Sequence, residues 1–329
     1  MFIVIEGTDA SGKSSLIAEI QKQLGADVEL FHKGRPEVET RRWVLDEYVI
    51  NVCNSYKLDK TFVSDRWHWG EVTYAPLKRQ HTNTDGFGLL GVAGWRWTEL
   101  FMLSRGITQF WLYQPLDVIT TRLQGRGDDF VSVDELSQIL DNYTKAAKET
   151  ASCLTLCPDS DSFSELPELA ASVIRIARER EQSVGKIAKH VGYIGGPNPQ
   201  VLLVGDKRND KTVTSLPFMP VNNNSGDYLL SCLPDPFWKN VGIINGDDIN
   251  GKPLQLLWQA LGHPRIVALG RMAEKFLKIS GFTDADYNVV PHPQYVRRFH
   301  HHDRMEYGAA IERLSKETPN KEEDPWTLR

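Results

Sequence analysis

A glycine-rich loop lies between a short apolar strand and an amphipathic helix at the start of the chain. Residues 2–5 are Phe, Ile, Val and Ile, and residues 7–14 read GTDASGKS. This is the pattern G-x-x-x-x-G-K-[ST], in which glycines let backbone N–H groups surround an anion at a helix N-terminus. Apolar residues spaced along 16–24 predict the helix that the pattern requires. We therefore expect a nucleoside triphosphate site, the alternative being a glycine-rich turn without a nucleotide.

The loop assigns candidate roles to individual residues. We expect Lys13 to reach the transferred phosphates and the Ser14 hydroxyl to bind Mg²⁺, which makes ATP and Mg²⁺ the expected cofactors. The residues expected to bind ATP are Gly7, Thr8, Asp9, Ala10, Ser11, Gly12, Lys13 and Ser14.

Composition limits the class of protein. The 329 residues allow two domains, and a content of 41% hydrophobic and 25% charged residues is typical of soluble proteins. No apolar run reaches the length of a membrane span, and we expect the first apolar stretch to be a core strand rather than a signal peptide. The four cysteines lack C-x-x-C spacing, which favours a reducing cytoplasm. The net charge of −5 neither requires nor excludes nucleic acid.

Strands and helices alternate along both halves, which predicts an α/β protein with parallel sheets. We expect domains at 1–183 and 201–314, a linker at 184–200 and a charged tail at 315–329. In the first domain, strands are expected at 2–5, 28–32, 61–64, 109–113 and 153–156, with a closing helix at 164–181. In the second, smaller domain, strands are expected at 201–204, 241–244, 265–269 and 288–290.

Charged residues follow two of the expected strands of the first domain. Asp65 and Arg66 come at the end of the third strand, where the crevice of a parallel sheet binds its ligand. Asp65 is a candidate to orient an acceptor hydroxyl or accept its proton, and Arg66 to neutralise the transferred phosphate. Arg122 and Arg126 follow the fourth strand in TTRLQGRGDDF, as candidates for a lid over the triphosphate. The alternatives are a structural Asp–Arg pair and a solvated charged loop.

Three segments together resemble the thymidylate kinase family over residues 1–180: IEGTDASGKSS, SDRWHWGEVTYA and FWLYQPLDVITTRLQGRGDD. The resemblance implies a P-loop kinase with a five-stranded parallel sheet that transfers phosphate from ATP–Mg²⁺ to a thymidine-like acceptor. By position, Lys13 and Ser14 match the residues that handle ATP–Mg²⁺. Asp65 and Arg66 match the family's DR motif, and Arg126 matches its lid.

The sequence departs from the thymidylate kinase pattern at two places that concern the phosphate acceptor. The family's Glu-Pro-Gly segment is replaced by HKGRP at 32–36, and the helix before Asp65 reads WVLDEYVINVCNSY, without the arginine that grips the acceptor's 5′-phosphate. Arg41 and Arg42 come earlier, and Lys33 or Arg35 are alternative partners for that phosphate. The departures favour a hydroxyl displayed on something larger than a free nucleotide.

The second half resembles the uracil-DNA glycosylase superfamily over about 110 residues. The resemblance rests on VLLVGD at 201–206, LPFMP at 216–220, GIIN at 242–245 and VPHPQY at 290–295. It implies that Phe218 stacks on a flipped base, Asn245 pairs with a pyrimidine edge, and His292 donates to the base oxygen. Asp206 falls on the position of the acidic residue that orients water. The alternative reading of each is an ordinary core, capping or hydrogen-bonded residue.

Other features of the second half leave its activity open. The first motif, GDKRNDKT, lacks the usual proline after the acidic residue, so base recognition without cleavage is an alternative to excision. Tyr295, Arg297 and Arg298 fall where family members press a loop into the DNA groove. A run of histidines at 300–302 followed by Asp303 is compatible with a metal site, although a basic loop near phosphate is favoured.

A phosphate-transferring domain joined to a base-reading domain resembles the bacteriophage 5-hydroxymethyluracil DNA kinases, within the thymidylate kinase relatives. That resemblance implies phosphorylation of the base's hydroxymethyl group in phage DNA, in the host cytoplasm, as a step in thymidine hypermodification. Hydroxymethyluracil-containing DNA and ATP are then the expected partners. Two alternatives remain: a deoxynucleoside (thymidine-type) monophosphate kinase, and a bifunctional kinase with uracil-DNA glycosylase activity. The sequence leaves the oligomeric state undetermined.

Overall fold

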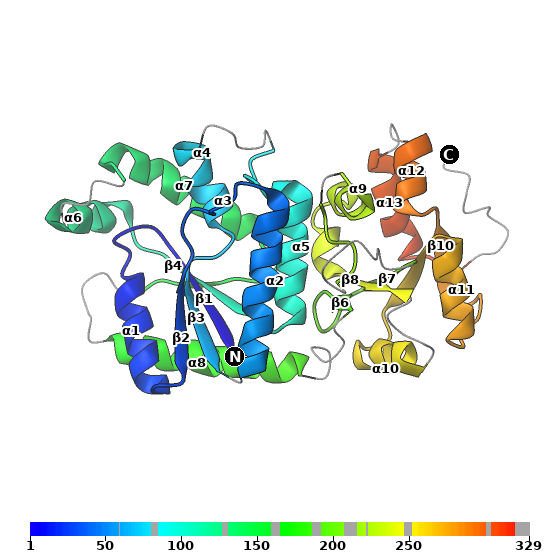
Figure 1. Ribbon diagram of the computed structural model, residues 1–329, viewed down its shortest axis with the longest axis horizontal. Coiled ribbons are helices and arrows are strands. Elements are labelled where there is room, and N and C mark those ends of the chain that lie inside the picture. Colours follow the sequence, from blue (N-terminus) through cyan, green and yellow to red (C-terminus); the bar gives the residue numbers. More distant parts are fainter. Residues whose placement is uncertain are drawn as a thin grey trace. The chain divides into compact units, whose positions relative to one another are not determined.

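The computed structural model describes residues 1–58, 60–79, 85–126, 131–158, 165–185, 192–206, 216–221, 223–246, 252–300 and 304–319. The chain divides into two compact units: Met1–Gly91 with Gly106–Gln182, and Val92–Arg105 with Ser183–Arg329. Each unit is built on its own five-stranded sheet with helices packed against it (Figure 1). Among the helices described, none has both the length and the apolar character needed to cross a bilayer.

The sheet of the first unit is parallel throughout, in the order β2-β3-β1-β4-β5. This confirms the five-stranded parallel sheet expected from the alternating pattern. The central strand β1 is buried along its whole length. The strands are β1 (Phe2–Glu6), β2 (Val28–His32), β3 (Thr61–Asp65), β4 (Thr108–Leu112) and β5 (Leu154–Leu156).

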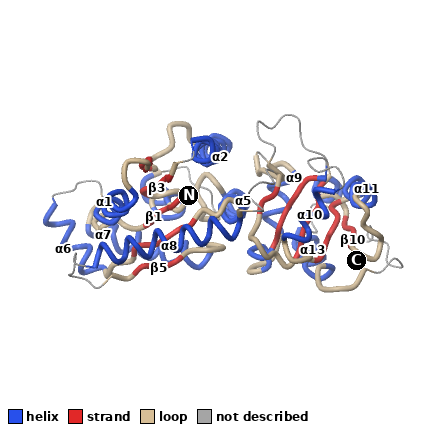
Figure 2. Tube along the Cα trace, turned by 90° about the horizontal axis from the view of Figure 1, so that it is seen from below, coloured by secondary structure: helices blue, strands red, loops and turns tan. Residues whose placement is uncertain are grey.

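Helices cover the two faces of this sheet (Figures 1 and 2). On one face Ile5 of β1 packs with Leu16 of α1 and Val173 of α8 in a single apolar cluster. On the other face Trp111 of β4 stacks on Tyr143 of α7, with ring centroids 6.3 Å apart. The helices are α1 (Lys13–Leu24), α2 (Arg41–Leu58), α3 (Gly70–Thr73), α4 (Ala75–Lys78), α6 (Leu116–Arg126), α7 (Val133–Glu149) and α8 (Leu166–Val184).

The second unit is also α/β, with strand order β10-β9-β7-β8-β6. Its strands are parallel except β6, which runs antiparallel to β8. β6 lies inside the segment 184–200 that the sequence predicts to be a linker, so part of that segment belongs to the sheet. The strands are β6 (Tyr193–Ile194), β7 (Val201–Gly205), β8 (Val241–Asn245), β9 (Arg265–Leu269) and β10 (Tyr287–Val290).

Helices α10 and α11 pack on one face of this sheet, where Leu257 and Leu277 join Val204 in an apolar cluster. The helices α9, α12 and α13 contact one another. At Gly308 of α13, an added Cβ would lie 1.8 Å from the Cys232 carbonyl oxygen, so α13 meets the end of α9 at backbone distance. The helices are α9 (Ser225–Cys232), α10 (Lys252–Ala260), α11 (Arg271–Ile279), α12 (Pro293–Phe299) and α13 (Arg304–Leu314), with a 3₁₀ turn at Phe237–Asn240.

Helix α5 (Gly91–Ser104) precedes β4 in the sequence but groups with the second unit. Arg96 is 7% exposed and donates to the carbonyls of Leu230 (2.8 Å) and Leu233 (2.6 Å). It also pairs with both carboxylate oxygens of Asp235 at 2.9 Å. A division at residue 183 would leave α5 in the first domain, whereas these contacts bind it to the second unit.

The start of the expected charged tail is packed against the second unit. Ser315 is 8% exposed, and the Asn288 side chain in β10 donates to the carbonyls of Leu314 (2.7 Å) and Glu317 (3.3 Å). The remainder, 320–329, lies outside the described residues.

We expect Arg96→Met to destabilise the protein by on the order of 3 kcal/mol, because the buried carbonyls lose a charged donor and Asp235 loses its partner. Chemical denaturation followed by tryptophan fluorescence measures this loss. Arg313→Met is the matched control, because Arg313 is 57% exposed and surface changes fall within about 0.5 kcal/mol. Equal stability of the two variants would contradict the role given to Arg96.

Candidate active site

The glycine-rich loop joins β1 to α1 as the sequence predicts. Gly7 has φ 156°, and a Cβ there would lie 2.9 Å from the Leu112 carbonyl oxygen. Gly12 immediately precedes α1 with φ 99°, in the left-handed region that favours glycine. A side chain at Gly7 would therefore have no room, and a side chain at Gly12 would require an unfavourable backbone conformation.

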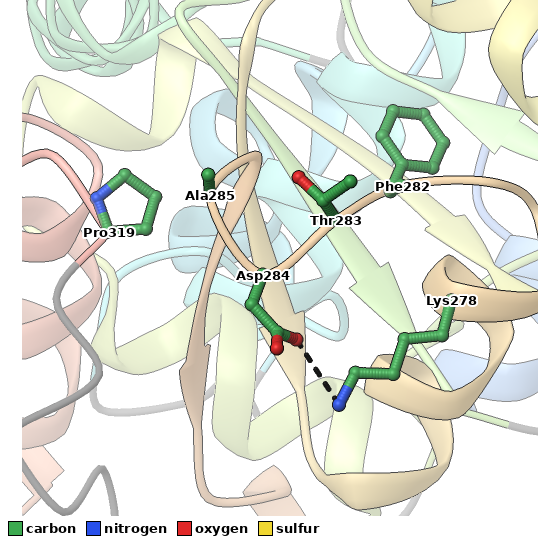
Figure 3. A pocket seen from close by; sticks show the side chains of 6 residues that line it. All are labelled: Lys278, Phe282, Thr283, Asp284, Ala285 and Pro319. Atoms are coloured by element: carbon green, nitrogen blue, oxygen red, sulfur yellow. Dashed lines mark ion pairs between the residues drawn. The ribbon is translucent and has the colours of Figure 1, made fainter.

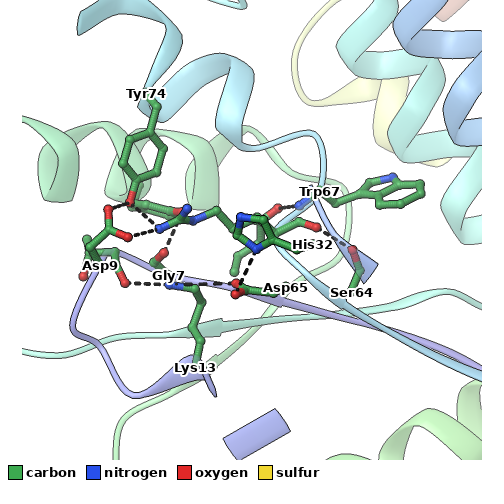
Figure 4. Close-up of polar contacts among 12 residues, drawn as sticks. Gly7, Asp9, Lys13, His32, Ser64, Asp65, Trp67 and Tyr74 are labelled. Carbon is green, nitrogen blue, oxygen red and sulfur yellow. Dashed lines mark hydrogen bonds and ion pairs between the residues drawn. The ribbon is translucent and has the colours of Figure 1, made fainter. Parts of the chain in front are cut away.

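Lys13 begins α1 and is 6% exposed. Its Nζ donates to the Thr8 carbonyl at 2.7 Å and lies 4.0 Å from Asp65 Oδ1 (Figure 4). Burial, together with the nearby positive charge of Arg66, lowers the pKa of Lys13 to about 8. The ammonium is thus held inside the loop and directed toward the end of β3.

Asp65 is the last residue of β3 and lies between two side chains from neighbouring elements. Its Oδ2 is 3.2 Å from His32 Nδ1 at the end of β2, and its Oδ1 faces Lys13. Within the described residues Oδ1 is buried and accepts no hydrogen bond. Asp65 is therefore fixed from one side by His32 and presents its other oxygen toward the loop.

Arg66 follows in a left-handed conformation, φ 68°. Its amide donates to the Ile5 carbonyl at 2.9 Å, and its own carbonyl accepts from the Ser64 hydroxyl at 2.6 Å. The guanidinium pairs with the Asp9 carboxylate, lies over the Tyr74 ring at 4.6 Å and donates to the Tyr74 hydroxyl at 3.1 Å. The structure thus brings Arg66 to the loop that contains Asp9.

Asp9 is held by both of its oxygens. Oδ1 pairs with Arg66, and Oδ2 accepts from the Tyr74 hydroxyl at 2.9 Å. Burial acts to raise the pKa of Asp9, but the charges of Arg66 and Lys13 outweigh it and lower the pKa overall. The carboxylate is therefore ionised at neutral pH and holds Arg66 in place.

Three residues that the sequence did not assign to the site contact it. Tyr74 completes the group around Asp9, and the Tyr143 hydroxyl of α7 donates to the Gly7 carbonyl at 2.8 Å. Glu6 is fully buried, and its Oε1 accepts from the Trp67 amide at 2.8 Å. Burial raises the pKa of Glu6 to about 7. Glu6 and Tyr74 lie in the segments IEGTD and VTYA, whose carboxyl and hydroxyl residues stand next to the predicted motifs, and this was the available signal for them. No signal in the sequence pointed to Tyr143.

The lid region is described in part. Arg122 of α6 donates to the Ala10 carbonyl at 3.5 Å and so contacts the loop. The side chain of Arg126, the predicted lid arginine, lies outside the described residues, as do 127–130.

Residues at the loop fit a magnesium ion that also binds phosphate oxygens. Ser14 is exposed at the second position of α1, and Asp65 offers a buried oxygen without a hydrogen bond. Hydroxyl and carboxylate oxygens are the ligands that Mg²⁺ takes when substrate phosphates supply the rest. Among the described residues there is no cluster of three or more His, Cys, Asp or Glu that could hold a metal; residues 301–303 lie outside them.

The predicted base-reading residues of the second unit gather at one edge of its sheet. Gly205 of β7 pairs with Asn245 of β8, and a Cβ on Gly205 would lie 2.3 Å from the Phe218 ring and 2.9 Å from Asn245 Oδ1. Phe218 and His292 have ring centroids 6.3 Å apart. Asp206 follows β7, and its carbonyl accepts from the Gly246 amide at 3.1 Å. Four residues distant in sequence therefore converge here, while 207–215 lie outside the described residues.

His292 caps α12, with Nδ1 accepting from the Gln294 amide at 3.2 Å. Burial lowers the pKa of His292, and the negative charge of Asp206 opposes that effect. A neutral imidazole that accepts at Nδ1 carries its proton on Nε2. His292 is therefore a hydrogen-bond donor through Nε2, as recognition of a carbonyl oxygen requires.

A surface hollow of the second unit contains none of these residues (Figure 3). Its one lysine, Lys278, already pairs with Asp284 at 3.2 Å. We assign no chemistry to it. Its lining is Lys278, Phe282, Thr283, Asp284, Ala285 and Pro319.

No protein-family model matches the chain, and no curated protein matches it by sequence. Among solved structures, it is similar to the YorR protein of Bacillus subtilis in complex with phosphorylated GDP, at 18% identity and a TM-score of 0.44, over 55% of this chain and 98% of that one. It is also similar to deoxyadenosine kinase from M. mycoides with bound dATP, at 17% identity, 53% and 100% coverage, and a TM-score of 0.37. Thymidylate kinase from Candida albicans matches at 15% identity, 55% and 93% coverage, and a TM-score of 0.35.

The raised pKa of Glu6 predicts a pH-dependent stability. Because the folded protein binds this proton more tightly than the unfolded chain, the contribution is fully present below about pH 4.5 and is lost as the pH rises through about 7. The loss amounts to about 3 kcal/mol. Glu6→Gln keeps an acceptor for the Trp67 amide but cannot ionise, so we expect it to remove this loss.

Chemical denaturation at pH 5 and pH 8 measures the effect. The pKa of Lys13, lowered to about 8, lies at the upper end of this range, so the comparison is made between the wild type and Glu6→Gln at each pH, since both proteins retain Lys13. Glu179→Gln, at a residue 60% exposed on α8, is the control and should keep the wild-type pH dependence. A Glu6→Gln protein with that same dependence would show that Glu6 is not its source.

Proposed function

We propose that the first unit is an ATP-dependent phosphotransferase. One observation carries the proposal. Lys13 lies close to Asp65 and Arg66, where the loop after β1 adjoins the end of β3. Phosphoryl transfer requires positioning and positive charge near the phosphates more than covalent chemistry. A cradle of backbone N–H groups, a buried lysine and an arginine supply both.

The residues of the chain then have distinct tasks. The acceptor oxygen attacks the γ-phosphorus, the bond to the β–γ bridging oxygen breaks, and ADP leaves with that electron pair. Lys13 and Arg66 stabilise the charge that develops on phosphate oxygens, and Asp65 orients the groups around the acceptor. Ser14 and Asp65 would hold Mg²⁺, which would supply additional charge neutralisation.

We propose the hydroxymethyl group of 5-hydroxymethyluracil in DNA as the acceptor. Of the four cations that are candidates to bind the phosphate of a nucleoside monophosphate, three have carboxylate partners, and the fourth, Arg41, donates to the Leu89 carbonyl at 3.2 Å. Lys33 pairs with Glu47, and Arg42 pairs with Asp46 at 3.4 Å. Arg35 pairs with Glu39 at 2.7 Å. A neutral hydroxyl acceptor needs no such grip.

The second unit supports a polynucleotide substrate. Phe218, Asn245 and His292 offer a stacking ring, an amide and an Nε2 donor, the groups that read a flipped pyrimidine. Next to them α12 exposes Arg297 and Arg298, and such arginines bind DNA phosphates. A base that is flipped out in this way belongs to DNA. Phage DNA lies in the cytoplasm of its host cell. Phosphorylation there is a step toward hypermodified thymidine.

One observation favours a second candidate, a bifunctional protein that also excises a base. The negative charge of Asp206 acts on His292, and an acidic residue beside a base-binding histidine suits glycosidic cleavage. We retain excision as the second candidate function.

We expect label from [γ-³²P]ATP to enter hydroxymethyluracil-containing duplex DNA and not thymidine 5′-phosphate. Lys13→Ala should lower this transfer by more than about 10³-fold, because it removes the charge that the transition state needs. Its DNA affinity, measured by fluorescence anisotropy, should stay unchanged.

Lys22→Ala is the control in the same helix, since Lys22 is 75% exposed and should leave transfer intact. Label entering only the mononucleotide would establish the monophosphate kinase instead. A Lys13→Ala protein with full transfer would refute the kinase proposal.

We expect His292→Ala to weaken binding to the modified duplex by about tenfold, the effect of one lost hydrogen bond. His263→Asn serves as control, because His263 is exposed and lies in a left-handed conformation that asparagine adopts easily. An abasic-site assay on the same duplex tests excision. Abasic sites made by the wild type and lost in His292→Ala would establish the bifunctional candidate.

A further inference from the structure

Lys33 is the first residue after β2, and aromatic rings surround its ammonium. Its amide donates to the Asp65 carbonyl at 3.0 Å, which places Lys33 at the same sheet edge as the candidate active site. The ammonium lies 5.4 Å from the ring centroid of Tyr48, 5.8 Å from that of Trp67 and 5.9 Å from that of Trp43. The side chain is 13% exposed. Rings at these distances hold a positive charge in one place.

A carboxylate completes this enclosure. Glu47 lies one helical turn after Trp43 on α2, so both side chains leave the same face of the helix. The Glu47 carboxylate forms an ion pair with the Lys33 ammonium. Trp67 adds a second donor, because its indole Nε1 is buried and has no hydrogen-bond partner among the described residues. The cluster thus combines two donors of the kind that bind an anion with an anion that the chain itself supplies.

The other two pairs between cations and carboxylates in this region are more exposed. Arg35 is 69% exposed and Arg42 is 46% exposed, and each pairs with a carboxylate four residues later in the chain. Exposed pairs of this kind contribute little free energy, so they compete weakly with a ligand phosphate. Lys33 and Glu47 lie on separate elements and are less exposed, which strengthens the attraction between their charges. Of the three pairs, this one withholds its cation from a ligand most effectively.

The Glu47 carboxylate resembles a phosphate group in its negative charge and its oxygens. A phosphomonoester brought to this edge of the sheet would need the Lys33 ammonium, but it would meet the negative charge of Glu47 there. Repulsion of the wrong ligand by a charge in the site is a general source of specificity. A hydroxyl acceptor without its own phosphate meets no such repulsion.

We propose that Glu47 is a specificity-determining residue of the first unit: its carboxylate takes the place of an acceptor phosphate on Lys33 and so excludes phosphomonoesters. The inference rests on the proposed kinase function and deepens it, because it names a residue that selects a hydroxyl group on DNA over a nucleoside monophosphate. Glu47 has no part in the transfer itself and acts through Lys33.

Glu47→Ala removes the carboxylate and leaves the Lys33 ammonium for a ligand. We expect its Kd for thymidine 5′-phosphate, measured by isothermal titration calorimetry, to fall by about 10- to 100-fold relative to the wild type, the effect of one hydrogen bond to a charged group. Its Kd for thymidine, which lacks the phosphate, should not change. With [γ-³²P]ATP, kcat/KM for thymidine 5′-phosphate should rise by a similar factor.

Three further variants relate the gain to the pair of Lys33 and Glu47. Asp46→Ala, at the neighbouring position of α2, removes the carboxylate of an exposed pair. It is the matched control and should change the affinity for thymidine 5′-phosphate by less than about threefold. Glu47→Ala combined with Lys33→Met should lose the gain, because the ammonium that binds the phosphate is absent. Glu47→Gln keeps the size of the side chain and removes its charge, so it should show the gain even if Glu47→Ala is unstable.

An unchanged affinity for thymidine 5′-phosphate in Glu47→Ala and Glu47→Gln would overturn the inference, while label in hydroxymethyluracil-containing DNA would leave the kinase function intact. Equal gains for thymidine and thymidine 5′-phosphate, or a gain that persists without Lys33, would show that the substitution merely opens space and would also overturn it. If the wild type phosphorylates only thymidine 5′-phosphate, or no acceptor, both the function and the inference fail.

Discussion

The register between β1 and β3 places Ile5 beside Asp65, and the polar cluster of the first unit depends on that pairing. Because the strands are parallel, the loop after β1 and the turn after β3 leave the sheet at the same edge. Lys13 and Asp65 meet for this reason, and the Arg66 amide can donate to the Ile5 carbonyl. A shift of one residue would turn Asp65 to the other face of the sheet.

In the second unit, the pairing of parallel strands also brings side chains together at one edge of the sheet, but these side chains differ in their chemistry. Gly205 and Asn245 are paired at the ends of β7 and β8, and the missing Cβ of Gly205 makes room for the Phe218 ring. His292 reaches this edge because it comes two residues after the end of β10 and caps the N-terminus of α12. Both units therefore place their polar groups at the carboxyl ends of parallel strands, one around a glycine-rich loop and one around an aromatic ring.

Local patterns predicted much of this arrangement. The loop glycines, the strands on both sides of them and the position of Asp65 at a strand end all follow from short-range sequence signals. Tyr143 did not, because its contact with Gly7 spans more than 100 residues. The place of α5 was missed for a similar reason: the partners of Arg96 at 230–235 are distant in sequence and gave no local signal.

The sequence by itself determined the alternation of strands and helices, the glycine-rich loop and the residue types available at each strand end. These depend on interactions between near neighbours, which periodicity and glycine placement express directly. Only the tertiary structure decided which charges neutralise one another, because pairs such as Lys33 with Glu47 and Arg66 with Asp9 depend on the distance between separate elements. It likewise decided that Asp65 faces His32 on one side and Lys13 on the other, since strand order and register, rather than local sequence, bring those three side chains together.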